Sequence, residues 1–121
     1  SLYQRRRAEV AAQRDRARDR ARSRAQEQAP AAEGEPRVLY FRSEHCTSCR
    51  TQARLWEDLE PSVRRLIEKV DVDRQVERAA AYNVMTLPTT VVMDAEGNVQ
   101  HINYGIVPAK KLYRQLGQVR A

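Results

Sequence analysis

The segment "RVLYFRSEHCTSCR", residues 37–50, joins a short apolar run to the only two cysteines of the 121-residue chain, Cys46 and Cys49. The apolar run, Arg37–Phe41, predicts a buried strand. Two residues separate the cysteines, and this spacing occurs in structural cross-links, in metal sites and in dithiols that exchange electrons with other proteins. The chain length allows one small domain, so this segment is the starting point for predicting both fold and function.

The rest of the sequence gives little support to two of these three interpretations. A cross-link over so short a loop gains little chain entropy, because that gain grows with loop length. A zinc site needs four ligands, usually Cys or His, and the only histidines are His45 and His101. We therefore predict a redox dithiol, with a structural disulfide and zinc or copper binding as alternatives, and we assign no metal ligand.

Helix and strand patterns alternate along the remainder of the chain. Apolar residues from Ala53 to Ile67, mostly at spacings of three and four, predict an amphipathic helix that is interrupted or kinked at Pro61. The other predicted elements are a strand over 69–73, a helix over 74–83, a hairpin of strands over 89–94 and 99–104, and a final helix over 108–116. A strand–helix–strand unit followed by a hairpin gives an α/β fold, in which a mixed sheet carries helices on both faces.

The first 36 residues differ in composition and predict an Arg/Ala-rich extension and linker before a domain over residues 37–121. The whole chain has a net charge of +6. Residues 1–30 hold nine arginines against four acidic residues, whereas residues 31–121 are nearly neutral. The arginines surround a helix instead of leaving an apolar face. We therefore expect the basic N-terminal extension to be a solvated helix or disordered.

Three interpretations of the extension are open: a solvated spacer, a juxtamembrane segment and a nucleic-acid-binding arm. "LYQRRR" (Leu2–Arg7) is typical of the cytoplasmic end of a transmembrane helix. It favours a membrane tether upstream of Ser1 and a cytoplasmic location at the membrane face, with an extracytoplasmic location as the alternative. No run in the chain reaches the roughly 20 apolar residues that span a bilayer. Interspersed acidic residues argue against specific nucleic-acid binding.

Residues 37–116 resemble the thioredoxin family. The resemblance rests on the Cys-x-x-Cys pair directly after a buried strand and at the start of a helix, and on Gly105 before the last helix. It also rests on three intervening motifs: "VDVD" (70–73), "NVMTLPT" (83–89) and "VVMDAEGNV" (91–99). It implies a thioredoxin-like three-layer fold and a thiol–disulfide oxidoreductase that needs no bound cofactor.

The resemblance also implies roles for individual residues. Cys46 corresponds to the attacking thiol, and Cys49 corresponds to the thiol that resolves the mixed disulfide. The Leu87–Pro88 peptide bond is expected to be cis and to face the Cys pair, with Leu87 in contact with the substrate. Lys69 matches a lysine that lies beneath the site in the family.

Three departures from the family pattern surround the Cys pair. His45 replaces the usual Trp before the first cysteine, and we expect it to contribute to substrate binding. Thr47-Ser48 replaces Gly-Pro, and its two hydroxyls are candidates for tuning the sulfur atoms. Tyr40 replaces the buried Asp that helps to deprotonate the resolving thiol. These changes leave the direction and rate of electron transfer open, but they retain the dithiol.

The predicted chemistry depends on a thiolate, because the anion and not the thiol attacks a disulfide. The first turn of a helix presents unpaired N–H groups and the positive end of the helix dipole, which stabilise a negative charge on Cys46. We expect a monomer that exchanges disulfides with protein thiols and receives electrons from a thioredoxin-reductase-like donor. A thioredoxin-fold adaptor with little turnover, or a Cys-x-x-Cys metal chaperone, is the alternative.

Overall fold

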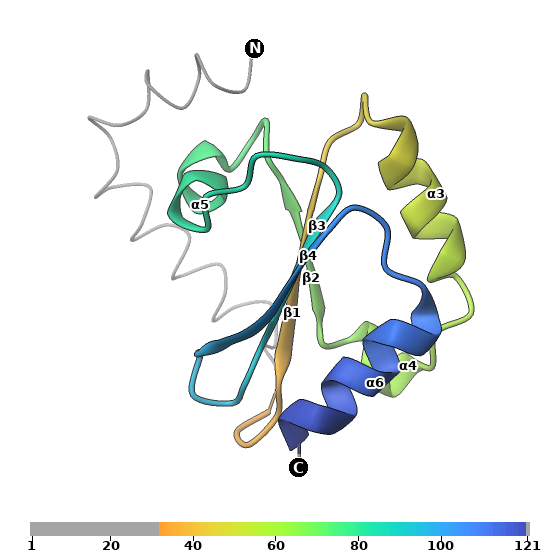
Figure 1. Ribbon diagram of the computed structural model, residues 1–121, viewed down its shortest axis with the longest axis vertical. Coiled ribbons are helices and arrows are strands. Elements are labelled where there is room, and N and C mark those ends of the chain that lie inside the picture. Colours follow the sequence, from red (N-terminus) through yellow and green to blue (C-terminus); the bar gives the residue numbers. More distant parts are fainter. Residues whose placement is uncertain (1–31, 121) are drawn as a thin grey trace.

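The computed structural model describes residues 32–120 of the chain. Residues 1–31, which include most of the predicted extension, lie outside the described residues, as does Ala121. Figure 1 shows the course of the described elements. In chain order they are β1 (Arg37–Arg42), α3 (Thr47–Leu55), α4 (Pro61–Arg64), β2 (Ile67–Asp71), α5 (Val76–Ala81), β3 (Thr89–Met93), β4 (Val99–Tyr104) and α6 (Ala109–Arg120).

The four strands form one sheet in the order β2-β1-β3-β4. β1 pairs with β2 in parallel and with β3 in antiparallel orientation, and β3 pairs with β4 in antiparallel orientation. In Figure 1, α5 lies on one side of the sheet, and α3, α4 and α6 lie on the other. The predicted α/β fold, a mixed sheet with helices on both faces, is confirmed.

The interruption predicted at Pro61 is present, and it divides the helix after the Cys pair into two shorter helices. α3 ends at Leu55, and α4 begins at Pro61, whose missing N–H suits the first turn of a helix. Leu55 is 45% exposed instead of lying on the apolar face, and Ile67 begins β2. The turn between the helices still presents buried side chains to the core of α3 and α4, which explains why the helical spacing continues across the break.

β1 is buried on both faces, and its side chains alternate between two apolar cores. Val38 and Tyr40 belong to the core on the side of α3, α4 and α6. Leu39 and Phe41 belong to the core on the side of α5. None of the four is more than 2% exposed. A central strand that is covered on both faces appears in the sequence as a continuous apolar run, as observed here.

A buried pair of amide side chains joins β4 to α6. Asn103 and Gln115 exchange two hydrogen bonds of 2.8 Å. We expect Gln115→Leu to lower the free energy of unfolding by about 1–3 kcal/mol, because the Asn103 amide would stay buried without this partner. Urea titration of the two proteins would measure the loss. An unchanged free energy of unfolding would contradict the expectation.

Candidate active site

The Cys pair lies between the end of β1 and the first turn of α3. Cys46 is the N-cap residue of α3, and its sulfur accepts a 3.1 Å hydrogen bond from the backbone N–H of Cys49. The two cysteines form a disulfide, with their Cα atoms 5.2 Å apart. Cys49 is 2% exposed, whereas Cys46 is partly exposed. Of the two sulfurs, the one of Cys46 is therefore the more accessible to a disulfide in solution.

The side chains beside the two cysteines are exposed. This is true of His45, Thr47 and Ser48. The Thr47 hydroxyl accepts a 3.4 Å hydrogen bond from the guanidinium of Arg50. In this disulfide state the partner of the Cys46 sulfur is a backbone N–H, and within residues 32–120 neither hydroxyl donates to a sulfur. Tuning by these hydroxyls therefore stays a prediction for the reduced state.

Hydrogen bonds fix the loop that leads from β1 to the Cys pair. The Ser43 hydroxyl donates to the carboxylate of Asp73 at 3.0 Å and accepts from the backbone N–H of His45 at 3.3 Å. At the end of β1, Arg42 forms an ion pair with Asp71 at 3.7 Å. The loop that precedes Cys46 is therefore held in place by the last residue of β2 and by the segment that follows β2.

Pro88 lies at the same end of the sheet as the Cys pair. Thr89, the next residue, is paired with Phe41 near the end of β1. The Leu87–Pro88 peptide bond is cis, and the Pro88 carbonyl accepts a 2.8 Å hydrogen bond from the N–H of Gly105. Gly105 has a φ of +91°, in the left-handed region that favours glycine. Leu87 is half-buried, and Pro88 is buried.

Exposed apolar side chains flank Leu87, Pro88 and Gly105 in the sequence. Met85 is 61% exposed, Tyr104 is 65% exposed and Ile106 is 41% exposed. No role was predicted for these three residues, although their positions next to the "LPT" motif and the glycine before the last helix are a usable signal in the sequence. Exposed apolar side chains that gather in one region are typical of interaction surfaces.

Tyr40 is both a core aromatic residue and a partner of the Cys pair. Its ring makes an edge-to-face contact with Trp56, with ring centroids 5.1 Å apart. Its hydroxyl donates a 2.9 Å hydrogen bond to the backbone carbonyl of Cys49. Burial raises the pKa of Tyr40. The phenol is therefore neutral at physiological pH and acts as a hydrogen-bond donor instead of a base.

The raised pKa of Tyr40 predicts a loss of stability at alkaline pH. An acid whose folded pKa exceeds its unfolded value, 10.0 for tyrosine, contributes its full stability below that value. The contribution is lost as the pH rises through the folded pKa. We expect the free energy of unfolding of the wild type to decrease more steeply above about pH 10 than that of Tyr40→Phe. Urea titrations across this range would measure both slopes, and equal slopes would contradict the expectation.

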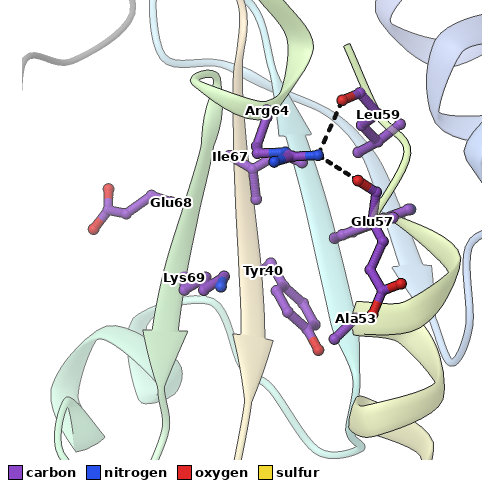
Figure 2. A pocket seen from close by; sticks show the side chains of 9 residues that line it. Tyr40, Ala53, Glu57, Leu59, Arg64, Ile67, Glu68 and Lys69 are labelled. Carbon is purple, nitrogen blue, oxygen red and sulfur yellow. Dashed lines mark hydrogen bonds between the residues drawn. The ribbon is translucent and has the colours of Figure 1, made fainter. Parts of the chain in front are cut away.

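Lys69 lies opposite Tyr40 in the pairing of β1 with β2, and both residues line a cavity of about 580 Å³. Figure 2 shows Tyr40 and Lys69 on neighbouring strands at this cavity. Arg64 lines it as well and donates hydrogen bonds to the backbone carbonyls of Glu57 and Leu59. Lys69 is exposed. Its charge therefore stands at the wall of an open cavity.

Gln52 was missed by the sequence analysis, although it is fully buried one turn after Cys49. Its amide donates a 2.9 Å hydrogen bond to the carbonyl of Val107 and accepts a 2.7 Å hydrogen bond from the N–H of the same residue. The available signal was its position in the stripe Cys49, Gln52 and Trp56, which follows the spacing of three and four of a buried helix face.

Within residues 32–120, no group of three or more His, Cys, Asp or Glu side chains is placed to hold a metal ion. No helix in the same range has the length and the apolar composition needed to cross a membrane.

The fold and the Cys pair can be compared with known proteins. The thioredoxin family profile matches residues 22–118, most of the chain. The chain belongs to the thioredoxin family. The matched range begins before residue 37, the predicted start of the thioredoxin-like domain. None of the curated proteins matches the chain significantly.

Solved thioredoxins share the fold of this family member. Thioredoxin from Fasciola hepatica is 27% identical with a TM-score of 0.64, over 82% of this chain and 90% of that chain. The reduced thioredoxin pre-protein of Schistosoma mansoni is 24% identical with a TM-score of 0.66, over 82% of this chain and 89% of that chain. Family membership, fold and the disulfide-bonded Cys pair together support a thiol–disulfide oxidoreductase in general.

Proposed function

We propose that this thioredoxin-family protein catalyses reversible dithiol–disulfide exchange with protein substrates through Cys46 and Cys49. The observation that carries the proposal is the asymmetry of the pair. Cys46 is partly exposed at the N-cap of a nine-residue helix, and Cys49 is buried one turn later and bonded to it. In such a pair, the accessible sulfur attacks the substrate disulfide, and the buried sulfur then resolves the mixed disulfide.

In the reducing direction, the Cys46 thiolate attacks one sulfur of a substrate disulfide, and the other substrate sulfur leaves as a thiolate. Cys49 loses its proton and attacks the Cys46 sulfur of the mixed disulfide. The Cys46–Cys49 disulfide forms, and the second substrate sulfur leaves as a thiolate. Two electrons have then passed to the substrate, and the reverse sequence oxidises a substrate dithiol. The N–H of Cys49 and the helix dipole stabilise the attacking thiolate.

Substrate contacts are assigned to Leu87, Pro88 and His45. Leu87 and Pro88 lie at the end of the sheet where α3 begins, and His45 is exposed directly before Cys46. The exposed side chains of Met85 and Tyr104 extend this region with apolar surface, which suits a protein substrate better than a small polar disulfide.

Tuning of the Cys pair is assigned to four further residues. Tyr40 acts through its hydrogen bond to the Cys49 carbonyl. The hydroxyls of Thr47 and Ser48 lie between the cysteines in the chain and can donate to a thiolate in the reduced state. Lys69 contributes a positive charge at the cavity beside Tyr40.

The proposal includes a setting for the reaction. The protein acts as a monomer on protein thiols and disulfides, receives electrons from a thioredoxin-reductase-like donor and is tethered by a segment upstream of Ser1 at the cytoplasmic face of a membrane. The arginine content of residues 1–30 supports this orientation. An extracytoplasmic location is the alternative, and fractionation of cells that express the full-length protein would separate the two.

Two measurements test the proposed activity. The protein should accelerate the reduction of insulin disulfides by dithiothreitol. Equilibration with glutathione should give the reduction potential of the Cys pair, which separates reductase-like from oxidase-like members across a range of about 150 mV. If the protein accelerates neither the reduction nor the oxidation of a protein substrate, the enzymatic proposal is wrong.

A second candidate function is a thioredoxin-fold adaptor whose dithiol turns over slowly. It is favoured by Tyr40, a neutral phenol at the position where the family resemblance implies a buried carboxylate, because a phenol with a raised pKa does not remove the proton of Cys49. Turnover of a small aromatic disulfide separates the two candidates. An adaptor would react no faster than a free dithiol.

A further inference from the structure

Three hydrogen bonds join α3 and its C-cap residue, Trp56, to one residue of the loop between β4 and α6. The amide of Gln52 forms two of them, to the carbonyl and the N–H of Val107. The indole N–H of Trp56 donates the third, to the same Val107 carbonyl at 3.0 Å. None of the three residues is more than 6% exposed. Gln52, Trp56 and Val107 are called the clamp below.

The clamp connects the helix of the Cys pair to the segment that contains Pro88. On one side, Gln52 lies one turn after Cys49 on α3. On the other side, Val107 follows Gly105 by two residues, and the N–H of Gly105 is bonded to the Pro88 carbonyl. The loop over residues 105–107 is therefore fastened to α3 at one end and to Pro88 at the other.

The polar character of Gln52 is unusual for its position. The buried residues that follow it in the chain, Trp56, Leu59 and Val63, belong to an apolar core. Burial of an amide costs free energy unless the group is hydrogen-bonded, and Gln52 satisfies this condition in one geometry, with both of its polar atoms bound to Val107. Apolar contact would leave the distance between helix and loop adjustable, whereas these directional bonds fix it.

We propose that Gln52, assisted by Trp56, is a positioning residue that sets the place of the loop over residues 105–107 relative to Cys46, and thereby the recognition of protein disulfides. The inference rests on the proposed function and names a determinant of its substrate class. Gln52 acts through Val107 and not on the sulfur atoms. A small disulfide needs only Cys46, whereas a protein substrate also needs the surface next to Pro88.

The variant Gln52→Leu tests this role. We expect kcat/KM for insulin to fall about tenfold, because small displacements of a binding surface have large kinetic effects. The change should appear mainly in KM. We expect kcat/KM for a small aromatic disulfide to change by less than about twofold, and the reduction potential to stay at the wild-type value, because the chemistry of the sulfurs is retained.

Two further variants distinguish the proposed positioning role from a general loss of stability. Gln115→Leu is the matched control, since Gln115 is also a buried glutamine with two hydrogen bonds, but its partner is Asn103 and not the loop. It should leave the ratio of the two kcat/KM values unchanged. Trp56→Phe removes the indole donor together with part of the buried ring, and it should lower kcat/KM for insulin in the same direction by a smaller factor.

Hydrogen exchange provides a readout that does not depend on turnover. The N–H of Gly105, bonded to Pro88, should exchange faster in Gln52→Leu than in the wild type, and no faster in Gln115→Leu. If kcat/KM falls equally for both substrates, or if Gln52→Leu and Gln115→Leu have equal effects, the clamp has a purely structural role and the proposal is wrong. If the wild type turns over neither substrate, the proposed function fails; unchanged exchange at Gly105 in Gln52→Leu overturns the clamp itself.

Discussion

Replacement of Cys49 by serine is expected to convert the protein into a covalent trap for its substrates. Cys46 still attacks the substrate disulfide, but a serine hydroxyl does not displace the substrate from the mixed disulfide. Turnover of insulin should therefore fall to the uncatalysed rate, while disulfide-linked adducts accumulate. Non-reducing electrophoresis followed by mass spectrometry would identify the adducts and the cysteine that carries them.

Cys46→Ser is the matched control for the trap. It removes the accessible sulfur and leaves Cys49, which is 2% exposed, as the sole thiol. We expect neither turnover nor adducts. Equal amounts of adduct in the two variants would contradict the assigned order of attack. Adducts in neither variant, together with an inactive wild type, would favour the adaptor function.

Tyr40→Ala is expected to have the largest effect on stability. The substitution removes a ring that is 2% exposed from the core beside β1, together with its contact to Trp56. Loss of a buried aromatic side chain costs about 3–5 kcal/mol. A small domain is stabilised by only about 5–15 kcal/mol. Thermal unfolding followed by circular dichroism would therefore show a marked decrease of the midpoint temperature.

Tyr40→Phe separates the contribution of the ring from that of the hydroxyl. The phenylalanine ring keeps the packing and loses only the hydrogen bond to the Cys49 carbonyl. We expect a cost of about 1 kcal/mol, the usual net value of one hydrogen bond. A loss as large as that of Tyr40→Ala would show that the packing argument is wrong.

The strands and their succession along the chain were predictable because they depend on local patterns. The hairpin is an example. The Asp94 carboxylate accepts hydrogen bonds from the N–H groups of Glu96 and Asn98, and Gly97 has a φ of +88°. Both features belong to the residues of one turn, so "DAEGN" was sufficient to predict it. The placement of Cys46 at the start of α3 was likewise a local consequence of a strand that ends just before a helix begins.

The contacts that sequence reasoning missed are those between residues far apart in the chain. Gln52 binds Val107, 55 positions later, and no local pattern identifies that partner. The hydroxyl of Tyr40 was expected to matter only as a substitution for a carboxylate, because its bond to the Cys49 carbonyl depends on how α3 packs on β1. The length of the break before Pro61 was not predicted, because the turn between α3 and α4 buries side chains at helical intervals.

Because β1 is buried on both faces, the two apolar cores of the domain are expected to unfold together. Its odd-numbered and even-numbered side chains enter different cores, so removal of either helix layer uncovers half of the central strand. Neither layer is therefore a separate cooperative unit, and melting is expected to be all-or-none. We therefore expect β1 to unfold only together with the rest of the domain, so that its amide protons exchange only through global unfolding.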